Sequence, residues 1–324
     1  MTKPALSRVA LVGAGPMARA YGHALRELGT DTVVVGRGEA SAKAFTDDVG
    51  LPVLTGGLAA NPEAVRDCTH AVIAAPVPAL SALSREVVEL GVPSVLVEKP
   101  AGLNLEEVQS LADTASTHGA SVFVAYNRRF YASVREAKRR IEADGGPTSF
   151  RFEISEWSKR IADSSNTPDT LAAWFLANSS HVIDMAFFLG GTPTHVSGSV
   201  AGSTEWHEPA VFVGHGVADT GALFSYHGDW NAAPRWMVEV STRGHTYMFN
   251  PLETLRVRTA DGFAIEDVEL PDADDDRRFK PGILRQTEAF LQGSEALLSI
   301  ADHAHRLRHA LLPMLEGTPK EVGR

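Results

Sequence analysis

The stretch from Arg8 to Leu28 constrains the fold of this chain more than any other. Four consecutive apolar residues, Val9 to Val12, are typical of a parallel strand buried on both faces. The strand ends at Gly13-Ala14-Gly15-Pro16-Met17-Ala18, a GxGxxA pattern, and a helical sequence follows. A strand, a glycine-rich turn and a helix in this order predict a dinucleotide-binding unit, because the helix N-terminus offers N–H groups and partial positive charge to phosphates.

Each small residue of the turn has its own task in this interpretation. Gly13 lets the chain turn tightly, and Gly15 lets bare backbone approach a pyrophosphate. Ala18 is small enough for the helix to pack against the strand that it has just left. We therefore predict that the cofactor phosphates bind over this turn, including Pro16 and Met17.

The end of the next strand bears on the choice between NAD and NADP. That strand is predicted over Asp31–Val35, and Gly36 and Arg37 follow it. An enzyme restricted to NAD usually places an acidic residue here to bind the ribose 2′-hydroxyl, whereas an arginine pairs with the 2′-phosphate of NADP. Because Gly36 occupies the acidic position, we predict NADP as the preferred cofactor. NAD is the alternative, since Glu39 could still bind a ribose hydroxyl.

Composition excludes several classes of protein. A length of 324 residues allows two domains, and 30 basic against 40 acidic residues give a net charge of −10, which argues against a nucleic-acid partner. The single cysteine, Cys68, leaves no internal disulfide and suits a reducing cytoplasm. The N-terminal sequence lacks the apolar core of a signal peptide, and no apolar run reaches the length of a membrane span. We expect a cytoplasmic protein with no membrane partner.

Strands and helices alternate between Arg8 and Ala125. Strands are predicted at 31–35, 70–75, 94–97 and 121–125, and helices at 80–90 and 105–117. This alternation predicts an α/β fold, with a Rossmann doubly wound parallel sheet and helices on both faces. Ala75 and Pro76 end one strand, and Glu98-Lys99-Pro100 end the next, where such a sheet meets its ligand.

The pattern changes after Ile141, where strand-like segments follow one another with few helices. They span 149–157, 195–202, 211–217, 221–227, 236–241, 246–250 and 264–270. Such a run predicts an α+β domain with a large, mostly antiparallel open sheet. Helices are predicted at 178–189, 282–292 and 298–315, and a solvated loop at 272–278. We place a boundary after Ala125, with a dinucleotide-binding domain over 1–125 and a substrate-binding and oligomerisation domain over 126–324.

Three separated motifs resemble one known family. They are the GxGxxA turn, Glu98-Lys99-Pro100, and His181-Val182-Ile183-Asp184 in a helix that ends at Gly190-Gly191. Their order and spacing resemble the glucose-fructose oxidoreductase and inositol dehydrogenase family, usually called Gfo/Idh/MocA. Tyr126-Asn127-Arg128-Arg129-Phe130 and Phe279-Lys280-Pro281-Gly282-Ile283 also fit its layout, so the resemblance spans nearly the whole chain.

The resemblance implies an NAD(P)-dependent dehydrogenase or reductase acting on a small-molecule substrate. Hydride transfer would join a nicotinamide and a carbonyl or carbinol carbon of a sugar, cyclitol or nucleotide-sugar. Lys99 would hydrogen-bond the reacting oxygen and His181 would exchange its proton, with both side chains facing one pocket. The proline after Lys99 is often cis in this family. The resemblance also implies a homodimer or homotetramer.

The chain departs from the family pattern at one position. Many members carry an aspartate four residues before the helix histidine, and here that residue is Ala177. Asn178 and Asp184 can share the histidine's helix face, so we predict that they bind substrate, although Asn178 cannot take a proton. Tyr126 is a further candidate for a catalytic proton donor. Which residue replaces the missing carboxylate stays open.

The remaining site predictions concern positions near these motifs. Asn127, Glu98 and Lys99 are predicted to bind the cofactor, together with Gly36, Arg37, Ala75 and Pro76. Arg128 and Trp174 are predicted to bind substrate, since arginine attracts phosphate and sugar rings stack on aromatic rings. No metal site is predicted, because His303, His305 and His309 are not accompanied by the glutamate of the H-E-x-x-H motif of a zinc helix.

Two other functions stay open. Ala177 removes a feature typical of the sugar-alcohol dehydrogenases, so the chain could reduce a non-sugar carbonyl or an imine. It could also be a ligand sensor that binds a nucleotide without turning it over. Retention of both Lys99 and His181 argues against the sensor.

Overall fold

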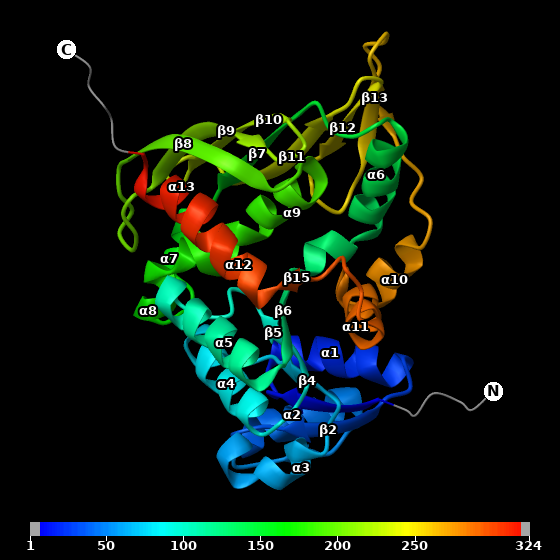
Figure 1. Ribbon diagram of the computed structural model, residues 1–324, viewed down its shortest axis with the longest axis vertical. Coiled ribbons are helices and arrows are strands. Elements are labelled where there is room, and N and C mark those ends of the chain that lie inside the picture. Colours follow the sequence, from blue (N-terminus) through cyan, green and yellow to red (C-terminus); the bar gives the residue numbers. More distant parts are fainter. Residues whose placement is uncertain (1–6, 319–324) are drawn as a thin grey trace. The chain divides into compact units, whose positions relative to one another are not determined.

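The computed structural model describes residues 7–318, which form two compact units (Figure 1). The first unit contains residues 7–127 together with Asp274–Ala304. The second contains Arg128–Ala273 and residues 305–318. We predicted that every residue after Ala125 belongs to the second domain. Residues 274–304 instead belong to the first unit. They join the first unit because one of their helices packs on its first helix and one of their strands extends its sheet.

A seven-stranded sheet forms the centre of the first unit, in the order β15-β6-β5-β4-β1-β2-β3. The strands from β1 to β6 are parallel, and β15 runs antiparallel to β6 at the edge. The chain leaves β1 in one direction for β2 and later returns to its other side as β4, which makes a doubly wound sheet with its ligand-binding switch point beside β1. The predicted Rossmann sheet is confirmed. The strands are β1 (Arg8–Val12), β2 (Asp31–Val35), β3 (Val53–Leu54), β4 (His70–Ile73), β5 (Ser94–Glu98), β6 (Ser121–Ala125) and β15 (Leu298–Ser299).

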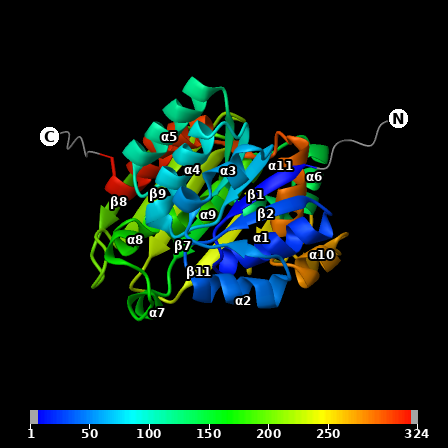
Figure 2. The same ribbon diagram turned by 90° about the horizontal axis from the view of Figure 1, so that it is seen from below.

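Helices cover both faces of this sheet. Figure 2 shows α1 and α2 on one side and α4 and α5 on the other. The first helix fits closely against its neighbour, since a Cβ on Gly22 would lie 2.8 Å from the ring of Phe45. The helices are α1 (Pro16–Glu27), α2 (Glu39–Val49), α3 (Pro62–Arg66), α4 (Leu80–Glu89), α5 (Leu105–His118), α10 (Ala273–Arg278) and α11 (Ile283–Gln292).

The helix α10 corrects the expectation of a solvated loop over 272–278. Its first turn carries Asp274, Asp275 and Asp276, and its last turn carries Arg277 and Arg278. Acidic side chains near the N-terminus and basic side chains near the C-terminus stabilise a helix through its dipole. The same charges that suggested solvation therefore also favour this short helix.

An eight-stranded sheet forms the second unit, in the order β14-β13-β12-β11-β7-β10-β9-β8. Only β7 and β10 pair in parallel among these neighbours, so the predicted large, mostly antiparallel sheet is confirmed. β13 was not predicted, and β14 is shorter than the expected strand 264–270. The strands are β7 (Ser149–Ser155), β8 (Pro193–Ala201), β9 (Val211–Ala218), β10 (Leu223–Asp229), β11 (Arg235–Ser241), β12 (His245–Phe249), β13 (Arg256–Thr259) and β14 (Glu266–Asp267).

The buried helix α9 (Ser180–Gly190) packs on this sheet against β7 and β11 (Figure 1). The ring of Phe187 meets Phe150, Phe152 and Phe224 edge-on, with centroids 5.3–6.2 Å apart. A Cβ on Gly190 would lie 2.3 Å from the Phe150 ring, so only glycine lets the helix end this close to the sheet. The other helices of this part of the chain are α6 (Ala132–Ala143), α7 (Ser158–Ala162), α8 (Pro168–Ala172), α12 (Ile300–Arg306) and α13 (Leu312–Glu316).

The predicted helices 178–189 and 298–315 are both modified by a turn of π-helix. Phe175–Ser179 forms one directly before α9, and Leu307–Leu311 forms the other between α12 and α13. A π turn inserts an extra residue into a helix and is common at functional sites. The first of them shifts the start of α9 and sets the positions of the side chains just before His181.

Candidate active site

The glycine turn between β1 and α1 is shaped for close approach of a ligand. Gly13 has a φ of +130°, and a Cβ there would lie 2.2 Å from the carbonyl oxygen of Ala74. Gly15 precedes α1, and no heavy atom lies within 4 Å of the position its Cβ would take. No side chain caps this helix N-terminus, while Ala18 is fully buried. The turn therefore fits a pyrophosphate, with backbone amides exposed above a tightly packed base.

Little free space surrounds Gly36, the residue that follows β2. A Cβ on Gly36 would lie 2.9 Å from Cγ1 of Val53 and 3.0 Å from Cβ of Ala14, so an acidic side chain could enter only if these neighbours moved. Arg37 follows and is exposed. These two positions thus carry an exposed arginine and no carboxylate, and their contact with the cofactor stays a prediction.

The Glu98-Lys99-Pro100 motif begins at the last residue of β5, which pairs with β4 in the same sheet. The Lys99–Pro100 peptide bond is cis, as the resemblance implies. The hydroxyl of Tyr21 donates a hydrogen bond of 2.8 Å to Oε1 of Glu98, and His303 Nε2 lies 3.0 Å from the carbonyl oxygen of Pro100. Contacts on both sides of Lys99 thus fix the backbone that carries it.

Burial raises the pKa of Glu98, and the positive charges of Lys99 and Lys280 act against that rise. Burial also raises the pKa of Tyr21, and the neighbouring Glu98 raises it further. A carboxyl group that is costly to ionise is held beside two lysines at the carboxyl edge of the sheet. This is the kind of perturbed group that marks a functional site.

Tyr126 and Asn127 follow β6 and are both buried. The Tyr126 ring packs against the His303 ring, with centroids 5.6 Å apart. Asn127 Nδ2 donates a hydrogen bond of 2.9 Å to the carbonyl oxygen of Pro281. Asn127 therefore holds the segment that contains Lys280, while its expected contact with the cofactor, like the proton-donor role of Tyr126, stays a proposal.

A pocket of about 590 Å³ opens in the second unit, and we call it the tryptophan pocket. Three tryptophans supply much of its apolar wall, and a carboxylate and an amide, Glu156 and Asn178, supply polar groups. Its lining consists of Ser155, Glu156, Trp157, Arg160, Ile161, Ser164, Asn166, Trp174, Asn178, Pro234, Arg235 and Trp236. Aromatic walls with a few placed polar groups are typical of small-molecule sites.

Glu156 is the functional candidate that the sequence did not reveal. It comes directly after β7 and is 4% exposed. Asn178 Nδ2 lies 3.2 Å from Oε1 and 3.1 Å from Oε2, and the Ser179 hydroxyl donates to Oε1 at 2.6 Å. The sequence predicted an uninterrupted strand over 149–157, and no motif in that strand distinguishes Glu156 from its neighbours.

Arg128 and Trp174, two of the predicted substrate residues, lie at or beside this pocket. The Arg128 guanidinium lies 4.9 Å from the centroid of the Trp236 ring, which lines the pocket, and Trp174 lines it directly. Asn178 also lines it, and His181 follows three residues later within α9. The structure thus brings two of the predicted substrate residues, Trp174 and Asn178, to one pocket and places Arg128 against the Trp236 ring.

Asp184 has a different environment. Arg129 Nε and Nη2 donate to its two oxygens at 2.8 and 2.6 Å, and Arg306 Nη1 donates to Oδ1 at 2.7 Å. All three side chains are buried, and Asp184 does not line the tryptophan pocket. The expectation that Asp184 binds substrate finds no support in this geometry, because its carboxylate holds α9 in place.

Residues 7–126 match a family model described as "Oxidoreductase family, NAD-binding Rossmann fold", that of Gfo/Idh/MocA. The chain therefore resembles the Gfo/Idh/MocA oxidoreductases in its NAD-binding part. It is 29% identical over 136 residues to myo-inositol dehydrogenase Hyg17 of Streptomyces leeuwenhoekii, which covers 42% of this chain and 41% of that relative. The chain matches about half the length of its two curated relatives, 58% of one and 41% of the other.

Solved structures resemble nearly the whole chain in fold. An oxidoreductase from Agrobacterium radiobacter in complex with NAD+, L-tartaric acid and magnesium has a TM-score of 0.77 at 19% identity, over 96% of this chain and 95% of that one. Levoglucosan dehydrogenase in complex with NADH has a TM-score of 0.75 at 20% identity, over 96% of each chain. At these identities the likeness concerns the fold.

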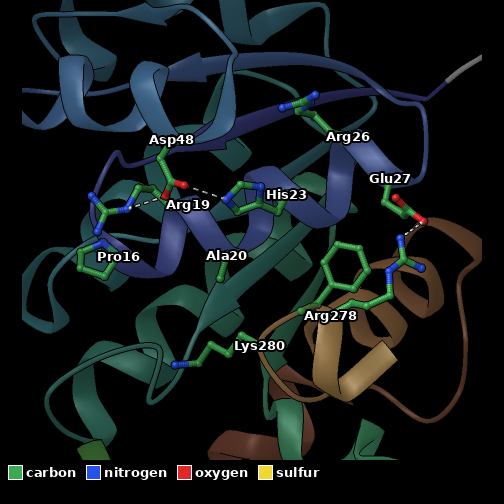
Figure 3. Close-up of a pocket in the computed structure, with 10 residues that line it drawn as sticks. Pro16, Arg19, Ala20, His23, Arg26, Glu27, Asp48, Arg278 and Lys280 are labelled. Atoms are coloured by element: carbon green, nitrogen blue, oxygen red, sulfur yellow. Dashed lines mark hydrogen bonds and ion pairs between the residues drawn. The ribbon is translucent and has the colours of Figure 1, made fainter. Parts of the chain in front are cut away.

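A second pocket of about 770 Å³, the α1 groove, lies in the first unit (Figure 3). Most of its charges are already paired, since Asp48 meets Arg19 and His23 at 3.3 and 3.2 Å and Glu27 meets Arg278 at 2.9 Å. Figure 3 shows Lys280 extending toward the end of the groove where Pro16 begins α1. We assign this groove no ligand.

Within residues 7–318 no group of three His, Cys, Asp or Glu side chains could hold a metal ion. Over the same residues, every helix is too short or too polar to cross a bilayer.

Proposed function

We propose that this oxidoreductase transfers a hydride between a nicotinamide cofactor, preferably NADP, and a carbonyl or carbinol carbon of a sugar, cyclitol or nucleotide-sugar. The observation that carries the proposal is the tryptophan pocket, which has aromatic walls and hydrogen-bonding groups, next in the chain to the helix that bears His181. Sugar rings stack on aromatic side chains and need polar partners for their hydroxyl groups. The myo-inositol and levoglucosan dehydrogenases to which the chain is similar act on ligands of this class.

The bound nicotinamide would supply the hydride chemistry. In the reducing direction negative charge develops on the carbonyl oxygen, and Lys99 would stabilise it as a cation that hydrogen-bonds this oxygen. His181 would donate the proton that completes the alcohol, a contribution typically of about 10² to 10⁴ in rate. In the oxidising direction the same two side chains would bind and deprotonate the alcohol.

The NADP preference rests on the end of β2. Gly36 offers no carboxylate to a ribose 2′-hydroxyl, and the space beyond its Cα is narrow. Arg37 offers a guanidinium to a 2′-phosphate, and such pairs form two parallel hydrogen bonds. NAD stays the alternative cofactor, because the backbone of the glycine turn would bind either nucleotide.

Turnover of a panel of sugars and cyclitols with NAD and with NADP tests this function. In wild-type protein we expect at least one neutral polyol to reduce NADP. Lys99→Ala should lower kcat by about 100-fold or more and leave the Kd for NADP within about twofold, because Lys99 acts mainly on the reacting oxygen. Lys43→Ala, which removes an exposed lysine paired with Asp47, is the matched control.

Three other outcomes of these experiments would contradict parts of the proposed function. An unchanged rate in Lys99→Ala would remove Lys99 from the mechanism. Tight nucleotide binding without turnover of any substrate would favour the ligand sensor, and turnover of imines or non-sugar ketones alone would favour the second type of reductase. The family resemblance further leads us to propose a cytoplasmic homodimer or homotetramer, which light scattering of the purified protein would test.

A further inference from the structure

This chain lacks the carboxylate that many Gfo/Idh/MocA members carry four residues before the helix histidine. The position four residues before His181 is Ala177, which is buried and carries no polar side chain. A dehydrogenase for polyols gains from a carboxylate near the reacting carbon, because a carboxylate accepts strong hydrogen bonds from hydroxyl groups. The second unit contains such a carboxylate close by in space, although it lies 21 residues before Ala177 in the sequence.

Glu156 is held in a fixed orientation. Its hydrogen bonds from Asn178 and Ser179 come from the π turn that leads into α9, so the carboxylate and the start of the histidine helix are positioned together. Burial of a carboxylate is costly unless hydrogen bonds compensate it. A carboxylate that is nearly covered and still lines a ligand-sized pocket is placed to bind something there.

Asn178 contributes a second acceptor. Because its Nδ2 group faces Glu156, its Oδ1 atom points away from that carboxylate, and it accepts no hydrogen bond from any residue between 7 and 318. The amide oxygen and the carboxylate thus present adjacent acceptors to the tryptophan pocket. Two neighbouring acceptors suit two neighbouring hydroxyl groups.

Trp174 contributes a donor. Its Nε1 is buried and has no hydrogen-bond partner within residues 7–318, although Trp174 lines the pocket. Buried donors are nearly always satisfied in folded proteins, so an unsatisfied one at a pocket points to a ligand oxygen. Acceptors at Glu156 and Asn178 and a donor at Trp174 together match hydroxyl groups, which both donate and accept.

We propose that Glu156 is the substrate-binding carboxylate that Ala177 does not provide. Glu156 and Asn178 accept hydrogen bonds from adjacent hydroxyl groups of a neutral polyhydroxylated ring, and the ring lies against the tryptophan walls. This inference rests on the proposed function and narrows its substrate class. The negative charge of Glu156 disfavours a sugar acid, whose carboxylate it would repel.

The first test is binding, because the three tryptophans of the pocket report on it directly. Quenching of tryptophan fluorescence should saturate with myo-inositol or D-glucose in the presence of NADP, and respond far less to D-gluconate at the same concentrations. Glu156→Gln keeps the size of the side chain and should weaken binding of the neutral ring by about 10- to 100-fold, as expected for loss of a charged hydrogen-bond acceptor. Glu239→Gln removes a carboxylate that binds Arg151 outside the pocket and should leave binding unchanged.

The second test is kinetic and uses deoxy analogues. Removal of the hydroxyl that Glu156 binds should lower kcat/KM in the wild type by the same 10- to 100-fold, and should have little further effect in Glu156→Gln. Glu156→Asp should recover part of the loss, because the charge is kept. If Glu156→Gln does not fold, Glu156→Asp and the analogue series in wild type carry the test.

The two proposals can fail separately. Equal affinity of wild type and Glu156→Gln for neutral rings, or stronger binding of D-gluconate than of D-glucose, would overturn the role of Glu156. Absence of any hydride transfer in wild type that still binds neutral rings through Glu156 would instead overturn the proposed enzyme function.

Discussion

Arg129 and Asp184 form a buried, two-pronged ion pair, with Nε–Oδ2 and Nη2–Oδ1 distances of 2.8 and 2.6 Å. Arg129 belongs to the turn that precedes α6, and Asp184 lies one turn of helix beyond His181. Arg306, at the end of α12, donates to the same carboxylate. Three separate segments thus meet at Asp184, which fixes the position of α9 and therefore of His181.

We expect Asp184→Asn to lower the free energy of unfolding by about 3–5 kcal/mol, because it leaves two buried guanidinium groups without their counter-charge. Urea denaturation followed by circular dichroism measures this. Asp47→Asn, which breaks an exposed pair with Lys43, should cost less than about 1 kcal/mol. Equal effects of the two substitutions would contradict the anchoring role of Asp184.

The two glycines of the cofactor turn should respond differently to alanine. Gly13→Ala places a Cβ against the Ala74 carbonyl and forces a φ that alanine avoids, so both the melting temperature and nucleotide affinity should fall. Gly15→Ala places its Cβ in open space, so the protein should fold normally and lose nucleotide affinity only. Thermal melts with and without NADP separate these effects, and normal nucleotide binding by Gly15→Ala would count against phosphate binding at this turn.

Arg37 should control cofactor choice. Arg37→Ala should raise the Kd for NADP by about 10- to 100-fold through loss of a charge-assisted hydrogen bond, and leave the Kd for NAD nearly unchanged. Isothermal titration calorimetry with both nucleotides gives the comparison. Arg66→Ala, which removes an exposed arginine on α3, serves as the control. An equal loss of affinity for both nucleotides, or for neither, would refute the proposed NADP preference.

Glu98 should impose a pH dependence on stability. Burial raises its pKa above the ordinary value of 4.5. A carboxyl group with a raised pKa in the folded state stabilises the fold fully below the unfolded pKa, and this contribution is lost as pH rises through the folded pKa. The wild type should therefore lose stability relative to Glu98→Gln as the pH rises above about 4.5.

Denaturation curves between pH 4 and pH 8 test this dependence on Glu98. Glu63→Gln, which alters an exposed carboxylate, should follow the wild type over the same range. A constant difference between wild type and Glu98→Gln at every pH would show that the carboxyl group of Glu98 does not titrate abnormally.

Tyr21 should affect the stability of the fold through its hydrogen bond to Glu98. Tyr21→Phe removes the hydroxyl that donates to Glu98, and an ionised buried acceptor left without its donor costs about 1–3 kcal/mol. The loss should be larger at pH 8 than at pH 4, because protonation of Glu98 weakens its need for a donor. In the Glu98→Gln background the effect of Tyr21→Phe should no longer vary with pH, which a double-mutant cycle would reveal.

Local sequence determined five of the seven strands of the first sheet, while the edge strands β3 and β15 were not predicted. The apolar run at Val9–Val12, the glycine turn and the strand at Asp31–Val35 are each short-range signals, and the structure has β1, α1 and β2 where they predict them. Segments of strand-like composition after Ile141 likewise predicted most strands of the second sheet. Such features follow from the chemistry of neighbouring residues, so they can be predicted without knowledge of the rest of the chain.

Tertiary structure alone decided three other matters. It brought Glu156 to Asn178 across 22 residues of sequence, it gave Asp184 two arginine partners from distant segments, and it joined residues 274–304 to the first unit. In each case the deciding contact depends on which strands lie side by side and how a helix packs on them. No local pattern encodes that order, because the contact forms only after the chain has closed long loops to build its sheets.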